Sequence, residues 1–188
     1  MKKLSTYYIL FLLSFSVYSF ADDISDFQIE GVSIGDSVLD YMSEEKIKKS
    51  NAFVYEDKKF TVLFYKSSEI YDSVGITFKS KDKNYKIHGV QGLIDFPANI
   101  SSCYNKQNKI EKEISLMFKE SQKIKWDILK TSQNGTYKPT TFDFKKGGQL
   151  LIACHHYPKK TKLDHLKISI KSKEYKEYTT LEAVKVNN

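Results

Sequence analysis

The sequence predicts an α+β fold in which helices pack on one face of an antiparallel sheet. Short segments that alternate apolar and polar residues recur between turn residues, which is typical of antiparallel strands. A longer segment, residues 100–118, instead spaces its apolar residues at helical intervals. The length of 188 residues suits a single domain with a substantial core.

The first 21 residues have the pattern of a secretory signal peptide. Lys2 and Lys3 precede an apolar run at residues 7–17, and Ser19 and Ala21 place small residues before a cleavage site. An uncleaved anchor helix is the alternative, but the apolar run is shorter than the roughly 20 residues of a spanning helix. We therefore expect cleavage between Ala21 and Asp22. Residues 22–188 would then form one exported α+β domain, without a lipid anchor or a transmembrane segment.

Residues 22–97 predict short helices followed by three longer strands. Asp36 or Ser37 is placed as a helix N-cap before Val38, and Ser43 as the cap of a second short helix. The expected strands are residues 27–32, 60–65, 74–78 and 85–94, with a turn at residues 80–84.

Residues 98–188 repeat this order, with a helix and then about three strands. The amphipathic segment 100–118 is the helix, and Ser172 caps a closing helix around residues 175–181. The expected strands are residues 124–128 (for which a helix stays open), 141–144, 149–154 and 166–170, the middle two joined by a turn at 145–148. The similar order raises the possibility of two related halves, 22–97 and 98–188, although no residue-level repeat is visible.

Cys103 and Cys154 are the two cysteines of the chain. Because the compartment outside the cytoplasm is oxidising, we expect them to form a disulfide that fastens the first turn of the long helix to a core strand. Neither belongs to a C-x-x-C pair, so a structural rather than a redox role is expected.

Two stretches, residues 29–40 and residues 86–95 through Cys103 and Tyr104, resemble small exported proteins of AT-rich bacterial genomes. Those proteins are uncharacterised, so this resemblance implies no activity. The order of a strand, Gly31-x-Ser33-x-Gly35, a helix and three strands also resembles the envelope-assembly lipoproteins and the β-lactamase-inhibitor proteins. That resemblance implies a sheet that binds protein, although this chain lacks the lipidation cysteine.

The same G-x-S-x-G pattern is that of a hydrolase nucleophile elbow with Ser33 as the nucleophile. A triad would also need a late acid and a histidine such as His155, His156 or His165. Because the patterning is antiparallel and the chain is short for that hydrolase fold, we favour a turn in which Ser33 or Asp36 caps a helix.

A metal site is a second catalytic alternative. Cys154, His155 and His156 are possible zinc ligands, with His88 or His165 as a further one. On a strand, Cys154 and His156 share one face while His155 points away. The expected disulfide would remove the thiolate, so we predict no cofactor and no metal.

The formal charge is +7, and every basic residue is lysine. The lysines are spread along the chain among acidic residues, and arginine, the usual reader of guanine, is absent, so no nucleic acid is expected. The densest cluster, Lys159, Lys160 and Lys162, could contact an anionic envelope surface. Six tyrosines could line a groove or simply pack as strand residues: Tyr55, Tyr65, Tyr85, Tyr157, Tyr175 and Tyr178.

These observations predict a non-catalytic exported protein, periplasmic or extracellular, that binds another envelope component, most simply a protein. The alternative is a carrier or sensor of a small ligand held between the sheet and its helices. A hydrolase or a metal enzyme is the third alternative.

Overall fold

The computed structural model describes residues 23–50, 52–65, 70–97, 99–131, 134–158 and 163–187, with the backbone alone for 182–187. The predicted signal peptide, with its cleavage site at Ala21 and Asp22, lies outside these residues. The helices are the 3-10 helices η1 (Ile24–Asp26) and η2 (Val38–Asp40) and the α-helices α1 (Glu44–Lys49), α2 (Ile100–Met117) and α3 (Lys173–Asn187). The strands are β1 (Ala52–Val54), β2 (Phe60–Tyr65), β3 (Ser73–Lys79), β4 (Ile87–Asp95), β5 (Gln122–Lys125), β6 (Leu129–Lys130), β7 (Thr136–Asp143), β8 (Gln149–His156) and β9 (His165–Lys171).

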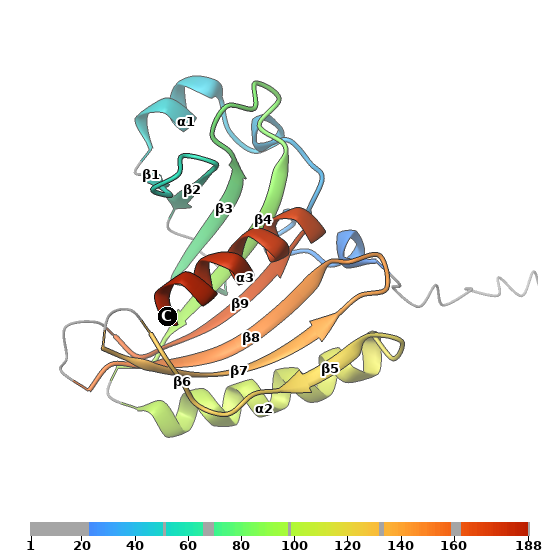
Figure 1. Ribbon diagram of the computed structural model, residues 1–188, viewed down its shortest axis with the longest axis vertical. Coiled ribbons are helices and arrows are strands. Elements are labelled where there is room, and N and C mark those ends of the chain that lie inside the picture. The colour runs from blue at the N-terminus through green and yellow to red at the C-terminus, as the bar shows by residue number, and fades with distance from the viewer. Residues whose placement is uncertain are drawn as a thin grey trace, which may run out of the picture.

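All described strands belong to one antiparallel sheet of order β1-β2-β3-β4-β9-β8-β7-β5, with β6 also paired to β7 (Figure 1). Neighbouring strands of β1–β4 and of β7–β9 follow each other along the chain. The pairing of β4 with β9, from Gly89 opposite Lys171 to Asp95 opposite His165, joins these two groups. The expected α+β class is therefore confirmed, and the possible halves share one continuous sheet.

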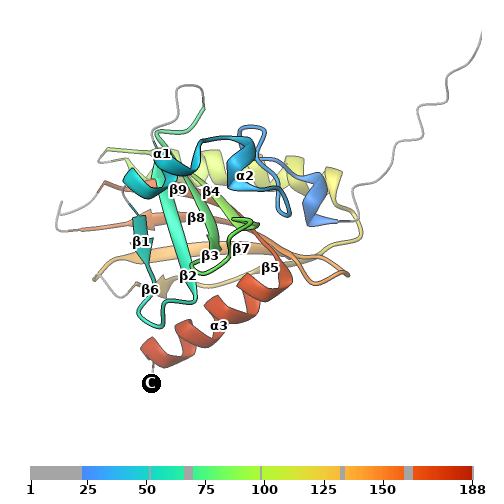
Figure 2. The same ribbon diagram turned by 90° about the horizontal axis from the view of Figure 1, so that it is seen from above.

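The helices lie on both faces of this sheet, rather than on the single face that we expected (Figure 2). Helix α2 covers the face formed by Ile152, Ile168 and other buried apolar side chains of β8 and β9. Helix α3 crosses the opposite face, where the Tyr175 ring packs so closely over Gly89 that a Cβ there would lie 2.7 Å from it. None of the described helices combines the length and the apolar character needed to cross a membrane.

The disulfide between Cys103 and Cys154 is present, with the Cα atoms 5.9 Å apart. Both side chains are fully buried, and they link the first turn of α2 to β8 as predicted. Asn99 caps the same end of α2, since its side-chain oxygen accepts a hydrogen bond from the backbone N–H of Ser102 at 3.0 Å. The start of α2 is therefore held by both a cap and a covalent bond.

The predicted strand at residues 27–32 is wrong. Glu30 and Gly31 both have positive φ angles, 50° and 75°, so the chain turns back on itself and only Ile29 and Val32 form a bridge. Phe27 and Ile29 both pack in the core, and their alternation with Gln28 and Glu30 is what resembles a strand. A short turn with two inward side chains and a strand with one buried face have the same local pattern.

The other predicted elements are formed, although the strand expected at 141–144 begins as early as Thr136, and the short strands β1 and β6 were not predicted. Ser37, Ser43 and Ser172 cap helices, each by accepting a hydrogen bond from a backbone N–H of the first turn. The segment 124–128, for which strand and helix were both open, contributes to β5, which ends at Lys125.

Reduction of the disulfide should lower the free energy of unfolding by about 4 kcal/mol, because the bond closes a loop across a sequence separation of 51 residues. Urea unfolding with and without reductant measures this difference. The Cys103→Ala/Cys154→Ala double variant is the control, and its stability should not respond to reductant. Equal stability of the oxidised and reduced wild-type proteins would contradict the prediction.

Candidate ligand-binding site

A groove of about 250 Å³ lies between α3 and the sheet, on the face opposite α2. Helix α3 passes in front of β4 and β9 and leaves β7 and β8 uncovered beside it (Figure 1). The residues that line the groove come from six elements and from Tyr55, which follows β1. They are Tyr55, Thr77, Val90, Gln91, Tyr137, Leu151, His155, Lys167, Ser169, Ile170, Lys171, Tyr175 and Thr179.

Strand β9 supplies three polar side chains to the groove. Its residues alternate between the faces, so Leu166, Ile168 and Ile170 are buried towards α2 while Lys167, Ser169 and Lys171 point the other way. This second face is only partly open to solvent, because α3 and the neighbouring strands border it.

The two lysines have little compensating negative charge. Among the described residues, the side chain of Lys167 forms no ion pair or hydrogen bond. Lys171 Nζ donates to Thr179 Oγ1 at 3.0 Å and lies 5.9 Å from the centre of the Tyr175 ring. The carboxylate of Asp143 is 2.9 Å from Lys176 Nζ, so it is already neutralised.

Burial in the groove alters the acidity of both amines. It lowers the pKa of Lys167 to about 8. It also lowers the pKa of Lys171 to about 7, and repulsion from Lys167 and Lys176 adds to this effect. A bound anion would reverse these changes, since an opposite charge favours the protonated amine.

Two further polar atoms in the groove lack hydrogen-bond partners among the described residues. They are Oγ of Ser169, a residue only 3% exposed, and Nδ1 of His155. An unsatisfied buried polar atom costs about 1–3 kcal/mol. Such atoms beside two lysines that form no ion pair with a described residue are a reason to look for a ligand.

Stacked rings border the groove at the end of β8. The His155 ring lies between Tyr137 on β7 and His165 on β9, with ring centres 5.1 and 4.7 Å away and nearly parallel planes. Burial, followed by repulsion from His165 and Lys167, lowers the pKa of His155 to about 3. This imidazole is therefore neutral near pH 7 and offers hydrogen bonds without charge.

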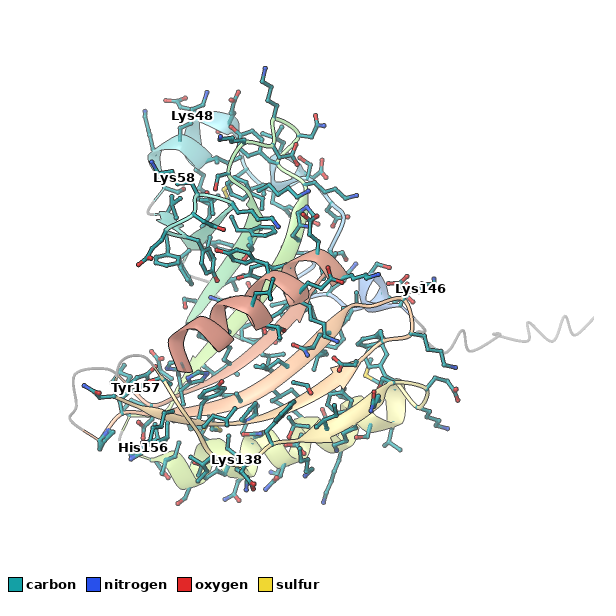
Figure 3. All side chains as sticks on the ribbon, in the orientation of Figure 1. Lys48, Lys58, Lys138, Lys146, His156 and Tyr157 are labelled. Carbon is teal, nitrogen blue, oxygen red and sulfur yellow. A yellow bond between two sulfur atoms is a disulfide. The ribbon has the colours of Figure 1, made fainter. Side chains whose placement is uncertain are left out.

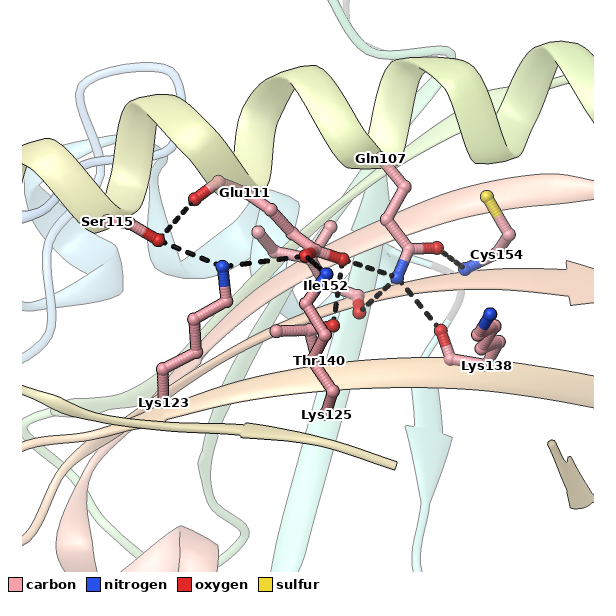
Figure 4. Close-up of polar contacts among 9 residues, drawn as sticks. All are labelled: Gln107, Glu111, Ser115, Lys123, Lys125, Lys138, Thr140, Ile152 and Cys154. Carbon is pink, nitrogen blue, oxygen red and sulfur yellow. Dashed lines mark hydrogen bonds and ion pairs between the residues drawn. The ribbon is translucent and has the colours of Figure 1, made fainter. Parts of the chain in front are cut away.

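The opposite face of the sheet has a buried polar cluster with its partners in place (Figure 4). Gln107 of α2 donates to the Lys138 carbonyl at 3.0 Å and accepts from the Cys154 N–H at 3.1 Å. Glu111 accepts from Thr140 at 2.8 Å and lies 2.7 Å from Lys125 Nζ. Burial raises the pKa of Glu111, but the hydrogen bonds from Lys125 and Thr140 lower it by more than burial raises it. The net shift of this pKa is therefore downward.

The contrast between the two faces distinguishes a structural cluster from a candidate site. Gln107 and Glu111 fasten α2 to β7 and β8 through bonds within the protein. The polar groups beneath α3 face a groove that is partly open to solvent instead. That arrangement is suited to binding a small molecule with negative charge.

The structure gives Ser33 a local role. Its backbone N–H donates to Asp36 at 3.1 Å, and Asp36 also accepts from the hydroxyl of Tyr41. The turn that contains Gly35 is bonded to the start of β4, where the backbone N–H of Gly35 donates to the carbonyl of Ile87 at 3.0 Å. The neighbouring His88 is bonded to Ser172 and so faces α3. The histidines considered for a triad, His155, His156 and His165, lie at the other end of β4, since His165 pairs with Asp95 and His155 pairs with His165. Ser33 and these histidines therefore do not form a catalytic pair.

The proposed metal ligands are separated. Cys154 is in the disulfide and supplies no thiolate. His156 is 3.0 Å from Asp164, which also accepts from the Tyr157 N–H, whereas His155 points to the opposite face. In the part of the chain that the structure describes, no three His, Cys, Asp or Glu side chains are grouped to hold a metal ion.

The predicted lysine cluster Lys159, Lys160 and Lys162 lies outside the described residues. Other lysines are spread over the molecule, as Lys48, Lys58, Lys138 and Lys146 show in Figure 3. Of the six tyrosines considered for a groove, Tyr55 and Tyr175 line it, and their hydroxyls are 2.8 Å apart.

Sequence reasoning missed Lys167, Ser169 and Lys171 as site residues. They occupy the polar positions of the expected strand 166–170 and its flanks. In an ordinary antiparallel sheet with one buried face, such polar positions face water. The closing helix expected after Ser172 was the available signal, because a helix that follows a strand at once can fold back over its face. No protein-family model, curated protein or solved structure matches this chain.

The Lys171→Met variant should be more stable than the wild type near pH 7, by about 1–3 kcal/mol, because a poorly compensated buried cation is removed. The folded pKa of about 7 lies below the ordinary 10.5, so the unfolded chain binds more protons between these values. Wild-type stability should therefore rise with pH across this range, and the advantage of the variant should shrink.

Urea unfolding between pH 6 and 9 measures this difference. Lys109→Met, at an exposed position of α2, is the matched control and should change stability by less than about 0.5 kcal/mol at every pH. A pH-independent difference for Lys171→Met would contradict the prediction.

Proposed function

We propose that the protein is a non-catalytic, exported binding protein and that the groove between α3 and the sheet takes a small anionic ligand. The observation that carries this proposal is the pair Lys167 and Lys171, without a free carboxylate between them, beside the unpartnered Ser169 hydroxyl. Two cations and a hydroxyl are the groups that bind carboxylate or phosphate oxygens.

The groove favours a small-ligand carrier or sensor over the protein-binding role that ranked first on sequence alone. A protein partner or an anionic envelope surface stays a prediction, because its candidate residues, Lys159, Lys160 and Lys162, lie outside the described residues. Residence in the periplasm or outside the cell is supported by the leader pattern and by the buried disulfide, which an oxidising compartment maintains.

We expect the protein isolated from its own host to begin at Asp22. Intact mass spectrometry of the periplasmic and medium fractions should give the mass of residues 22–188. This mass should be lower than that of the reduced chain by two hydrogens, because the disulfide has formed. Ala21→Asp, which removes the small residue before the cut, should keep the leader attached. A full-length wild-type mass would contradict this prediction.

Benzoate should stabilise the protein, whereas the neutral benzamide should not. For a ligand present at ten times its dissociation constant, the gain is about 1.4 kcal/mol, and the melting temperature should rise by a few degrees. Differential scanning calorimetry at pH 6.5, below the pKa values of both groove lysines, measures the effect.

Lys167→Met should abolish the benzoate effect, and the matched surface variant Lys109→Met should retain it. Equal stabilisation by benzoate and benzamide, or an unchanged response in Lys167→Met, would remove the support for an anion site.

A further inference from the structure

A second hollow of about 250 Å³ continues the groove along α3 towards β7. Tyr137, Leu151, Lys171 and Thr179 line both hollows, so the two are contiguous. The other lining residues of the second hollow are Trp126, Leu129, Pro139, Thr141, Gln149 and Thr180.

The second hollow is mainly apolar and is open to solvent. Trp126 and Leu129 keep 46% and 37% of their surface exposed there. The indole N–H of Trp126 donates to Thr141 Oγ1 at 3.2 Å, so the polar atom of that ring is satisfied within the protein. What Trp126 offers to a ligand is therefore its apolar ring surface.

The first hollow differs in charge, since Lys167 lies only there and Lys171 lies where the two hollows meet. A ligand that extends through both would have its charged end near Ser169 and Lys167. Its remaining atoms would extend from the junction at Lys171 along Leu151 to Trp126.

We propose that the ligand is an amphipathic organic anion, with a carboxylate head at Lys167 and Lys171 and an apolar chain against Trp126 and Leu129. This inference rests on the proposed function and adds the chemical class of the ligand. Charge complementarity determines the head, because Asp143, the carboxylate near Lys171, is already paired with Lys176. The exposed apolar side chains determine the tail, because their burial is favourable.

The volumes set the length of the chain. At about 30 Å³ for a water-sized group, each hollow takes roughly eight non-hydrogen atoms. Acetate would then fill a part of the first hollow, whereas octanoate would extend into the second.

The test is a titration with acetate, butyrate, hexanoate and octanoate at pH 6.5. Trp126 is the single tryptophan of the chain, so intrinsic fluorescence reports on the second hollow. Affinity from calorimetry should increase about two- to fourfold for each added methylene. Octanoate should also shift the tryptophan emission to shorter wavelength, and acetate should not.

Matched variants separate the head from the tail. Lys171→Met should weaken octanoate binding at least about tenfold, since a charge-assisted hydrogen bond is lost. Leu129→Asn should weaken octanoate and leave acetate unchanged, whereas Leu116→Asn, at an exposed leucine of α2, should change neither. Circular dichroism confirms that each variant is folded.

The outcomes distinguish this inference from the proposed function. Equal affinity for acetate and octanoate, with no change in Trp126 emission, would overturn the amphipathic ligand and leave the anion site in place. Octylammonium binding as tightly as octanoate would overturn the anionic head. If no carboxylate binds, benzoate included, both proposals fail.

Discussion

The pairing of β4 with β9 is the contact on which the rest of the structure depends. It makes one sheet from strands that lie far apart in sequence, with Gly89 opposite Lys171 and Gln91 opposite Ser169. Gly89 gives Tyr175 of α3 room to pack on the sheet, and Lys171 and Ser169 then lie beneath and beside that helix. Without this pairing, the groove would have neither its floor nor its cover.

The buried polar groups on the two faces of the sheet differ in how far they are paired within the protein. Under α2, Glu111 and Gln107 are bonded to strand carbonyls, hydroxyls and lysines, so the polar cluster holds the helix in place. Under α3, the charges of Lys167 and Lys171 are left largely uncompensated, which costs stability unless a ligand neutralises them. A stability cost confined to an enclosed groove is a common property of binding sites.

Local patterns predicted most of the elements because their causes are local. Ser43 and Ser172 precede helices that they cap, and the alternation in residues 166–170 is that of a strand. The segment 27–32 was misassigned because Phe27 and Ile29 alternate with polar residues as in a strand, although the chain turns back at Glu30 and Gly31. The helix 100–118 was correct, but its buried Gln107 and Glu111 were not foreseen, since polar residues on a helix are usually exposed.

The sequence by itself determined the α+β class, the caps, the cysteine pair and the expectation of export, because each depends on composition or on residues close along the chain. Only the tertiary structure decided that Lys167, Ser169 and Lys171 form a site. Their side of β9 becomes enclosed when α3 folds back over it and when β7 and β8 lie alongside. Whether a polar strand face meets water or a groove depends on which distant segment covers it, and alternation along one strand contains no information about that segment.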